Sequence, residues 1–70
     1  MSEIQSVLFD KKKWTIPTAN EWLIYHNIKP MKMEHTTNRF YRYRIRDPTK
    51  FSRIRTIETR SGVYLLIGFP

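Results

Sequence analysis

The sequence predicts an α+β fold in which one helix packs on a mostly antiparallel sheet, in the coarse order β-α-β-β-β. Three observations lead to this class. Residues 15–27 carry apolar side chains at helical spacing, residues 39–46 alternate between two faces, and the C-terminal segment resembles a hairpin. Because the 70 residues contain no linker or low-complexity stretch, we expect one domain, residues 1–70.

The N-terminal part of the chain is expected to form a strand and then the helix. Ile4–Phe9 mixes alternation with a short apolar run, which suits a strand. In residues 15–27, Pro17 fits the first helical turn, where no donor is needed, and Pro30 ends the helical stretch. The positions at i, i+3, i+4 and i+7 form one stripe that would lie on the sheet: Ala19, Trp22, Leu23 and His26.

Two segments are expected in the middle of the sheet. Met31–Thr37 alternates weakly and could form a second strand. Arg39–Arg46 is the clearest strand, because its apolar residues from Tyr41 to Ile45 fall on one face. The other face of this strand would carry three arginines, Arg42, Arg44 and Arg46.

The C-terminal part reads as a turn followed by a hairpin. Pro48 supplies no ladder donor, so "DPTKF" should form a turn or one short helical turn with Phe51 tucked inward. "SRIRTIET" and "VYLLIGF" flank "RSG", where Gly62 can take a positive φ. The last strand is apolar on both faces, which indicates a central position in the sheet or a covering partner.

The composition narrows the class of protein. Thirteen Lys and Arg against six Asp and Glu give a net charge of +7, which is typical of proteins that bind nucleic acids or anionic surfaces. Aromatic and β-branched residues are too plentiful for a disordered basic tail. The longest apolar run is far below the ~20 residues that span a bilayer, and the N-terminus lacks a secretory layout. We therefore expect a soluble protein with no membrane partner.

The small size favours self-association. A chain of this length buries only about 60% of the surface that its unfolded form exposes, and its core rarely contributes more than roughly 3–5 kcal/mol. The chain has no cysteine, which fits a reducing intracellular setting, and only two histidines, His26 and His35. Because disulfides are excluded and a metal is not expected, we predict a homo-oligomer, a dimer in the first place, that buries the apolar C-terminal strand.

The arginine strand is the strongest candidate for binding. Its arginines would stand about 6.6 Å apart along one face and would repel one another unless they are solvated, paired with acids or facing an anion. The planar guanidinium fork suits phosphate bidentately. The row therefore indicates phosphate recognition. The alternative is the solvated face of an edge strand, where charges discourage aggregation.

Further cations extend this basic tract. Three lysines precede Trp14 at the entrance to the helix, where an N-terminus attracts anions, although a solvated loop is equally consistent with them. The predicted nucleic-acid-binding residues are Arg42, Arg44, Arg46, Arg53, Arg55, Lys11, Lys12, Lys13 and Lys50. Four phosphate contacts on duplex DNA would give a salt slope near about −3.6, from about −0.9 for each contact.

Aromatic residues between the arginines raise a second possibility, the stacking of unpaired bases on Phe40, Tyr41 or Tyr43. Core packing is the better interpretation, because Tyr41 and Tyr43 share a face with Ile45.

Catalysis has no recognisable motif. The sequence contains no nucleophile-elbow motif, no phosphate-binding glycine loop and no HExxH motif, and the six acidic residues are not spaced as pairs. His26, on the helical stripe, is expected to be a core residue, and His35 to stand in a polar strand or loop. We expect no enzyme, no cofactor and no metal.

Several short stretches of the chain resemble those of a known group of proteins. They are Trp14, "EWLIYH" at 21–26, "IKPMK" at 28–32, "YRYRIRDPTKF" at 41–51, "IRT" at 54–56 and the final "LLIGF". Together they resemble a small basic virion-associated domain of large double-stranded DNA viruses, the Marseillevirus-like giant viruses, with relatives in tailed phages. The resemblance implies a protein of the virion, associated with the genome or the inner capsid. In the infected host it would be intracellular, in the cytoplasm or nucleus.

These observations predict a virion-associated protein that binds nucleic acid, double-stranded DNA in the first place, without reading its sequence. The alternative is a structural capsid or scaffold module whose basic face meets acidic protein partners such as capsid proteins. The preference between DNA and RNA stays open, because phosphate contacts discriminate poorly between them.

Overall fold

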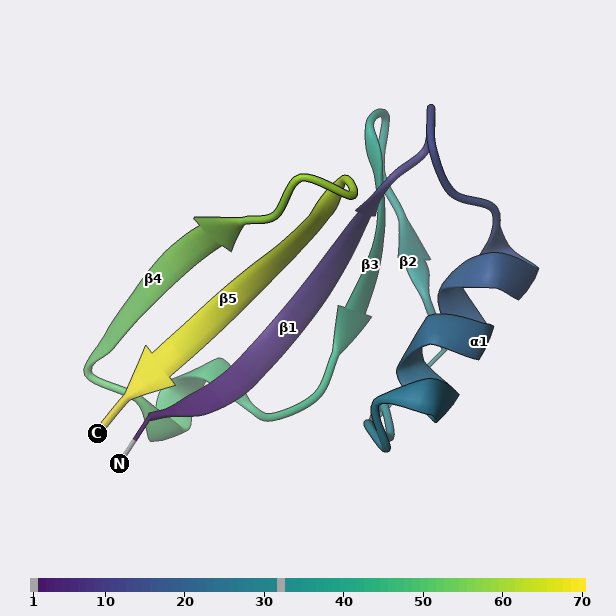
Figure 1. Ribbon diagram of the computed structural model, residues 1–70. Helices are drawn as coiled ribbons and strands as arrows, with labels where there is room; N and C mark the ends of the chain where they lie inside the picture. Colours follow the sequence, from purple (N-terminus) through teal and green to yellow (C-terminus); the bar gives the residue numbers. More distant parts are fainter. Residues whose placement is uncertain (1, 32) are drawn as a thin grey trace.

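The computed structural model describes residues 2–31 and 33–70, and there five strands form one antiparallel sheet with one α-helix beside it (Figure 1). The elements are β1 (Glu3–Asp10), α1 (Ile16–Tyr25), β2 (His35–Thr36), β3 (Phe40–Arg44), the 3-10 turn η1 (Pro48–Lys50), β4 (Arg53–Glu58) and β5 (Val63–Phe69). The strands lie in the order β2-β3-β1-β5-β4 across the sheet. The predicted α+β class is confirmed, with one strand more than the coarse order.

The second strand is much shorter than the segment predicted for it. Among the described residues of 31–37, His35–Thr36 alone pairs as a strand, and it forms one edge of the sheet beside β3. Met1 and Lys32, the second of which belongs to this segment, lie outside the described residues. The last strand, β5, lies between β1 and β4, which is the first of the two arrangements predicted for it, a central position or a covering partner.

β3 ends at Arg44, two residues before the predicted end. The backbone N–H groups of Ile45 and Arg46 both donate to the carbonyl oxygen of Gln5, at 2.8 and 3.1 Å. Two residues that face a single partner form an irregularity of the bulge kind, which interrupts the alternation of side chains. The sequence of β3 alone does not reveal this end, because its cause lies on β1.

Both ends of α1 are capped by local hydrogen bonds. The Thr15 hydroxyl accepts from the backbone N–H of Thr18 at 3.3 Å, and the Thr18 hydroxyl accepts from that of Thr15 at 2.9 Å. At the other end Asn27 takes a left-handed conformation with φ of 57°, and the N–H of Ile28 donates to the Leu23 carbonyl at 2.9 Å. None of the helices in the described chain has the length and apolar character that crossing a membrane requires.

The helical stripe is shorter than predicted, and His26 is not a core residue. α1 ends at Tyr25, so only Ala19 and Leu23 of the stripe are fully buried, with Trp22 half-buried. His26 lies exposed just beyond the helix, where its ring stacks on Trp22 with 3.9 Å between centroids. Its Nδ1 atom lies 2.9 Å from the Trp22 carbonyl oxygen, so the imidazole closes the helix end instead of filling the core.

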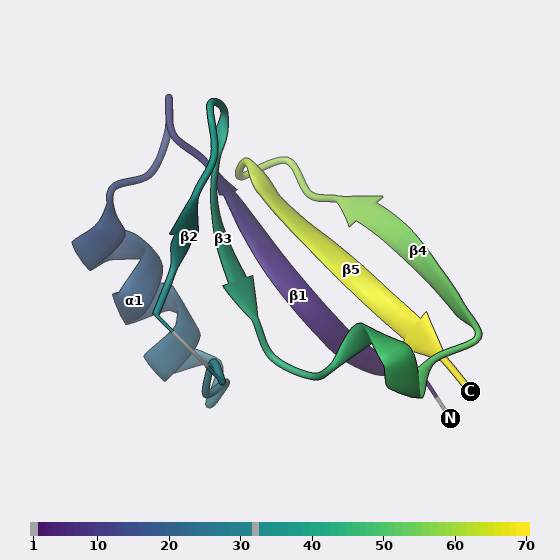
Figure 2. The same ribbon diagram turned by 180° about the vertical axis from the view of Figure 1, so that it is seen from behind.

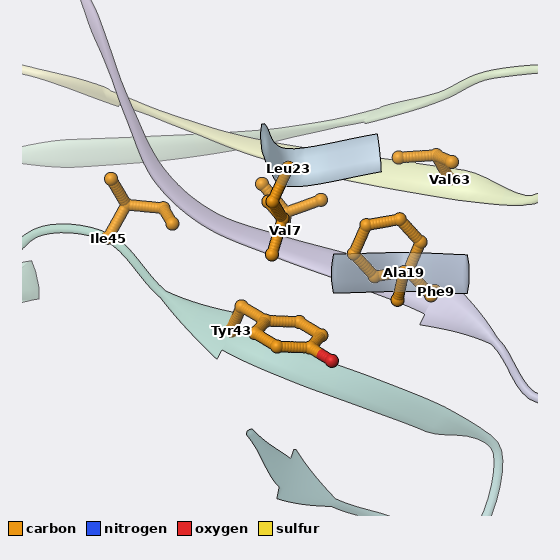
Figure 3. Close-up of a cluster of buried hydrophobic side chains, with 7 residues drawn as sticks. All are labelled: Val7, Phe9, Ala19, Leu23, Tyr43, Ile45 and Val63. Atoms are coloured by element: carbon orange, nitrogen blue, oxygen red, sulfur yellow. The ribbon is translucent and has the colours of Figure 1, made fainter. Parts of the chain in front are cut away.

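The core lies between α1 and one face of the sheet (Figure 3). Its buried side chains come from β1, α1, β3 and β5, and from the residue that follows β3. They are Val7, Phe9, Ala19, Leu23, Tyr43, Ile45 and Val63. Phe9 is fully buried and makes edge-to-face contacts at 5.1, 5.6 and 5.5 Å with Trp14, Trp22 and Tyr43. Such pairs contribute about 0.5–1.5 kcal/mol each beyond the burial of their area.

The opposite face of the sheet carries no helix of the described chain along most of its length. Seen from behind, only η1 lies over it, at the end near the chain termini (Figure 2), where the Phe51 ring rests against Gly68. We call the rest of this surface the open face. The strand register places on it Leu8, Phe40, Arg42, Arg44, Tyr64 and Leu66.

α1 also covers only half of the sheet face on which it packs. α1 lies beside β2 and β3, whereas β4 and β5 extend away from it (Figure 1). Every residue of β4 is exposed, including Ile54 and Ile57 at 41% and 50%. β4 is the second edge of the sheet, and its outer backbone groups have no strand partner in the described chain.

Replacing Tyr43 with phenylalanine should stabilise the protein. The Tyr43 side chain is 2% exposed, and its hydroxyl has no hydrogen-bond partner among the described residues. Burial raises the pKa of this hydroxyl above its usual value. A buried polar group without a partner costs about 1–3 kcal/mol, so Y43F should raise the free energy of unfolding in urea by about 1 kcal/mol. Y41F, on the same face but half-buried, is the matched control and should change little; a clear loss of stability in Y43F would show that the hydroxyl is bonded.

Adding a methyl group at Gly68 should destabilise the protein through Phe51. A Cβ at position 68 would overlap the Phe51 ring, so the ring would have to leave its place over β5. Overpacking of this kind costs about 1–3 kcal/mol. In a double-mutant cycle measured by urea unfolding, G68A should cost much less in an F51A background. An equal cost in both backgrounds would contradict the contact.

Candidate nucleic-acid interface

Arg42 and Arg44 project from β3 onto the open face. Their strand partners on β1 are Leu8 and Ser6, whereas Tyr43 between them is buried on the α1 side. This part of the predicted alternation is confirmed. The two arginines stand about 6.6 Å apart along the strand, Arg42 half-buried and Arg44 exposed.

His35, which the sequence places in a polar strand or loop but not in the binding site, joins these arginines. His35 of β2 lies directly opposite Arg42 in the ladder, so both side chains share the open face. With Met33, the three residues line a hollow of about 360 Å³. The hollow thus offers two guanidinium groups and an imidazole, all of which can donate to an anion. In the sequence, this arrangement is indicated only by the spacing of Met33 and His35, which are two positions apart and so would face the same side of a strand.

The charges of Arg42 and Arg44 are not consumed by carboxylates. Among residues 2–31 and 33–70, the one ion pair joins Arg46 Nε to Glu3 Oε2 at 3.2 Å. Asp47 is the acid nearest in sequence to Arg44, and two hydrogen bonds from Thr49 already occupy one of its oxygens. These bonds are the main cause that holds the Asp47 pKa below its usual value, with smaller contributions from nearby cations.

Arg46 departs from the predicted row of three. It lies beyond the end of β3, and it lines a hollow together with Ile28 and Ile45, which belong to the α1 side of the molecule. Its guanidinium is paired with Glu3. The row on the open face therefore consists of two arginines instead of three.

Arg53 and Arg55 lie on the other side of the sheet. Their partners on β5 are Phe69 and Ile67, which alternate in step with the core residue Val63. The Arg53 guanidinium lies 5.5 Å from the centroid of the Phe69 ring, a distance typical of a cation–π contact. These two arginines thus form a basic surface beside the uncovered half of the α1 side, separate from Arg42 and Arg44.

The three lysines lie at the end of the sheet where three turns meet. The N–H of Lys11 donates to the Arg39 carbonyl at 3.0 Å, and the indole of Trp14 donates to the Ser61 carbonyl at 2.7 Å. These bonds gather cations from all three turns, and we call the group the turn cluster: Lys11, Lys12, Lys13, Arg39 and Arg60. Sequence reasoning missed Arg39 and Arg60, because only the fold brings the turns together.

Lys50 lies at the opposite end, in the last position of η1. It lines a shallow hollow with Met31, Asp47 and the paired residues Glu3 and Arg46. The nine predicted residues therefore divide among the open face, the α1 side and both ends of the sheet. No single surface contains all of them.

An aromatic pair completes the open face near the turn cluster. Phe40 and Tyr64 stand on either side of β1, edge to face, with 5.1 Å between ring centroids. Tyr41 and Tyr43 face α1, as predicted, but Phe40 shares the face of Arg42. The Tyr64 hydroxyl donates to Glu58 Oε2 at 3.0 Å, and this bond is the main reason that the Tyr64 pKa is raised.

The arrangement on the open face suits binding of an anion, because Arg42 and Arg44 present guanidinium groups on one side of the sheet. In the described part of the chain, no three His, Cys, Asp or Glu side chains gather in a way that could hold a metal ion. The cations are arginines and lysines that reach outward from a rigid sheet.

No protein-family model, no curated protein and no solved structure matches this chain.

Proposed function

We propose that this protein binds nucleic acid without reading its base sequence, through phosphate contacts centred on Arg42 and Arg44. The observation that carries the proposal is the position of these two guanidinium groups, adjacent on the open face and in no ion pair within the described residues. A guanidinium bonds a phosphate bidentately. On neighbouring positions of a pleated strand, two of them present fixed donors to a backbone of regularly spaced phosphates.

The remaining charge supports the same function. The net charge is +7, and the turn cluster adds cations at this end of the sheet, with Arg39 over the Phe40 ring and Lys11 over the Tyr41 ring on the α1 side. Contacts to phosphate position a protein on nucleic acid but carry no sequence information. A surface of arginine and lysine therefore fits binding that tolerates any sequence.

The proposal places the protein in a virion with double-stranded DNA as its first ligand. Its support is the resemblance to virion-associated domains of large DNA viruses, together with the basic surface. Phosphate contacts are common to DNA and RNA, so the chemistry of Arg42 and Arg44 covers both.

A homodimer belongs to the proposal as well. β4 is a free edge with Ile54 and Ile57 exposed, and edges of this kind pair readily with a further strand. β5 cannot itself accept a new neighbour, because β1 and β4 occupy both of its sides. Pairing through β4 would give a dimer with twice the number of phosphate contacts of one protomer.

A second candidate function is a capsid or scaffold module whose open face meets an acidic protein. The apolar side chains Leu8, Tyr64 and Leu66 on that face favour it, since protein interfaces combine an apolar centre with a polar rim. In this case the arginines would steer association with the acidic partner.

Charge removal on the open face should weaken duplex binding more than the same charge removal on the α1 side. We compare R42Q/R44Q with R53Q/R55Q, which lose equal charge, by titrating short duplexes of unrelated sequence at several salt concentrations. If Arg42 and Arg44 each contact a phosphate, their loss should reduce the slope of log affinity against log salt by about 1.8, at about 0.9 for each contact. The R53Q/R55Q slope should stay close to that of the wild type.

Three results would contradict parts of this proposal. Equal losses in the two double variants would show that net charge, not the open face, governs binding. Strong preference among the duplex sequences would contradict non-specific recognition. No duplex binding at low salt would reject the function and favour the protein-interaction module.

The dimer can be tested by sedimentation equilibrium of the purified protein. I54T/I57T retains β-branched side chains but removes exposed apolar surface from β4. Since each lost methylene contributes about 0.8 kcal/mol, the variant should weaken dimerisation by at least about tenfold. I24T, at a 76% exposed position of α1, is the control and should leave it unchanged. A wild-type protein that stays monomeric at all concentrations would contradict the proposed homodimer.

A further inference from the structure

We propose that the open face binds unpaired nucleic acid, with a base stacked on the Phe40–Tyr64 pair and its neighbouring phosphates on Arg42 and Arg44. This inference rests on the phosphate-binding part of the proposed function and adds that the same site accepts an unpaired strand besides a duplex.

The aromatic pair is placed as a platform and not as core. Phe40 and Tyr64 belong to β3 and β5, and each ring is half-buried on a face that no described helix covers. By contrast, Tyr43 of β3, under the helix on the α1 side, is 2% exposed, and Tyr41 on that side is half-buried. The two rings are inclined at 75°, and an edge-to-face contact covers at most one face of one ring. The contact between the rings therefore leaves ring surface for a base, which would share the Phe40 ring with the Arg39 guanidinium that lies over it.

Cations flank this platform in the order that a single strand needs. Phe40, Arg42 and Arg44 share one face at spacings of about 6.6 Å, and His35 lies beside Arg42. On the other side of Phe40, the Arg39 guanidinium lies 5.8 Å from the centroid of its ring. A stacked base would thus have a cation on either side to meet its phosphates. A duplex hides the faces of its bases, so only an unpaired strand can use the rings and the arginines together.

The acids near the platform restrict where phosphates can lie. Glu58 accepts the Tyr64 hydroxyl hydrogen bond, which fixes the orientation of that ring. Asp10 Oδ1 accepts the backbone N–H of Lys12 at 2.9 Å. Glu58 is the ladder partner of Tyr64, and Asp10 is the ladder partner of Phe40, so both carboxylates border the platform on the side away from Arg42 and Arg44. The strand's phosphates are therefore directed along β3, toward the two arginines.

The test compares three ligands of equal length with the full-length protein: an oligothymidylate, an abasic oligomer with the same phosphates but no bases, and a duplex. The wild type should bind the oligothymidylate more tightly than the abasic oligomer. F40L keeps apolar bulk but removes the aromatic face, and should weaken oligothymidylate binding by at least about fivefold, the equivalent of one lost stack of about 1 kcal/mol. Its affinity for the abasic oligomer should not change.

F40W restores an aromatic face and should recover the oligothymidylate affinity that F40L loses. It also reports stacking directly, because fluorescence of a tryptophan at position 40 should be quenched by the oligothymidylate and not by the abasic oligomer. The wild-type protein, in which Trp14 and Trp22 lie on the α1 side, provides the background signal. This signal keeps the inference testable even if F40L folds poorly, which urea unfolding would reveal.

The outcomes separate this inference from the function on which it rests. Equal affinity for the oligothymidylate and the abasic oligomer, or no quenching in F40W, would overturn the stacking site. If R42Q/R44Q still weakened duplex binding in that case, the phosphate-binding function would stand alone. Failure to bind any of the three ligands at low salt would overturn both.

Discussion

The fold depends on the contacts of one ring, that of Phe9. Phe9 stands on β1, the strand at the middle of the sheet, and touches Trp14 before α1, Trp22 within α1 and Tyr43 on β3. One side chain therefore joins the central strand, the start of the helix and the neighbouring strand. Because so small a chain has few large apolar groups, this cluster anchors α1 over one half of one face and leaves the other surfaces of the sheet without a layer of their own.

The uncovered surfaces of the sheet carry most of the arginines and the aromatic pair. The open face holds Arg42, Arg44 and the Phe40–Tyr64 pair, while the exposed part of the α1 side holds Arg53 and Arg55. The rigid ladder of β1 with β3 sets the separation between the groups on the open face. The same shortage of core that limits the stability of the domain thus creates its candidate binding surface.

Local patterns predicted much of this arrangement, and long-range pairing determined the rest. The helix and the opposition of Arg42 to Tyr43 follow from periods of 3.6 and 2 within single segments. The exit of Arg46 from the row could not be predicted, because it depends on Gln5, whose amide also bonds the Arg46 carbonyl across 41 positions of sequence. The placing of His35 beside Arg42, and of Arg53 on the opposite side, likewise depends on strand register.

β4 carries a further consequence for the behaviour of the protein in a crowded setting. It is an exposed edge that carries isoleucine at two positions and arginine at two others, Arg53 and Arg55. Because Arg53 and Arg55 lie on the side of the sheet opposite Arg42 and Arg44, a nucleic acid bound on the open face would leave the isoleucines and the free backbone groups of β4 accessible. Copies bound next to one another on one nucleic acid would then meet with their β4 edges free, so that binding of the ligand and pairing of the protein would favour each other.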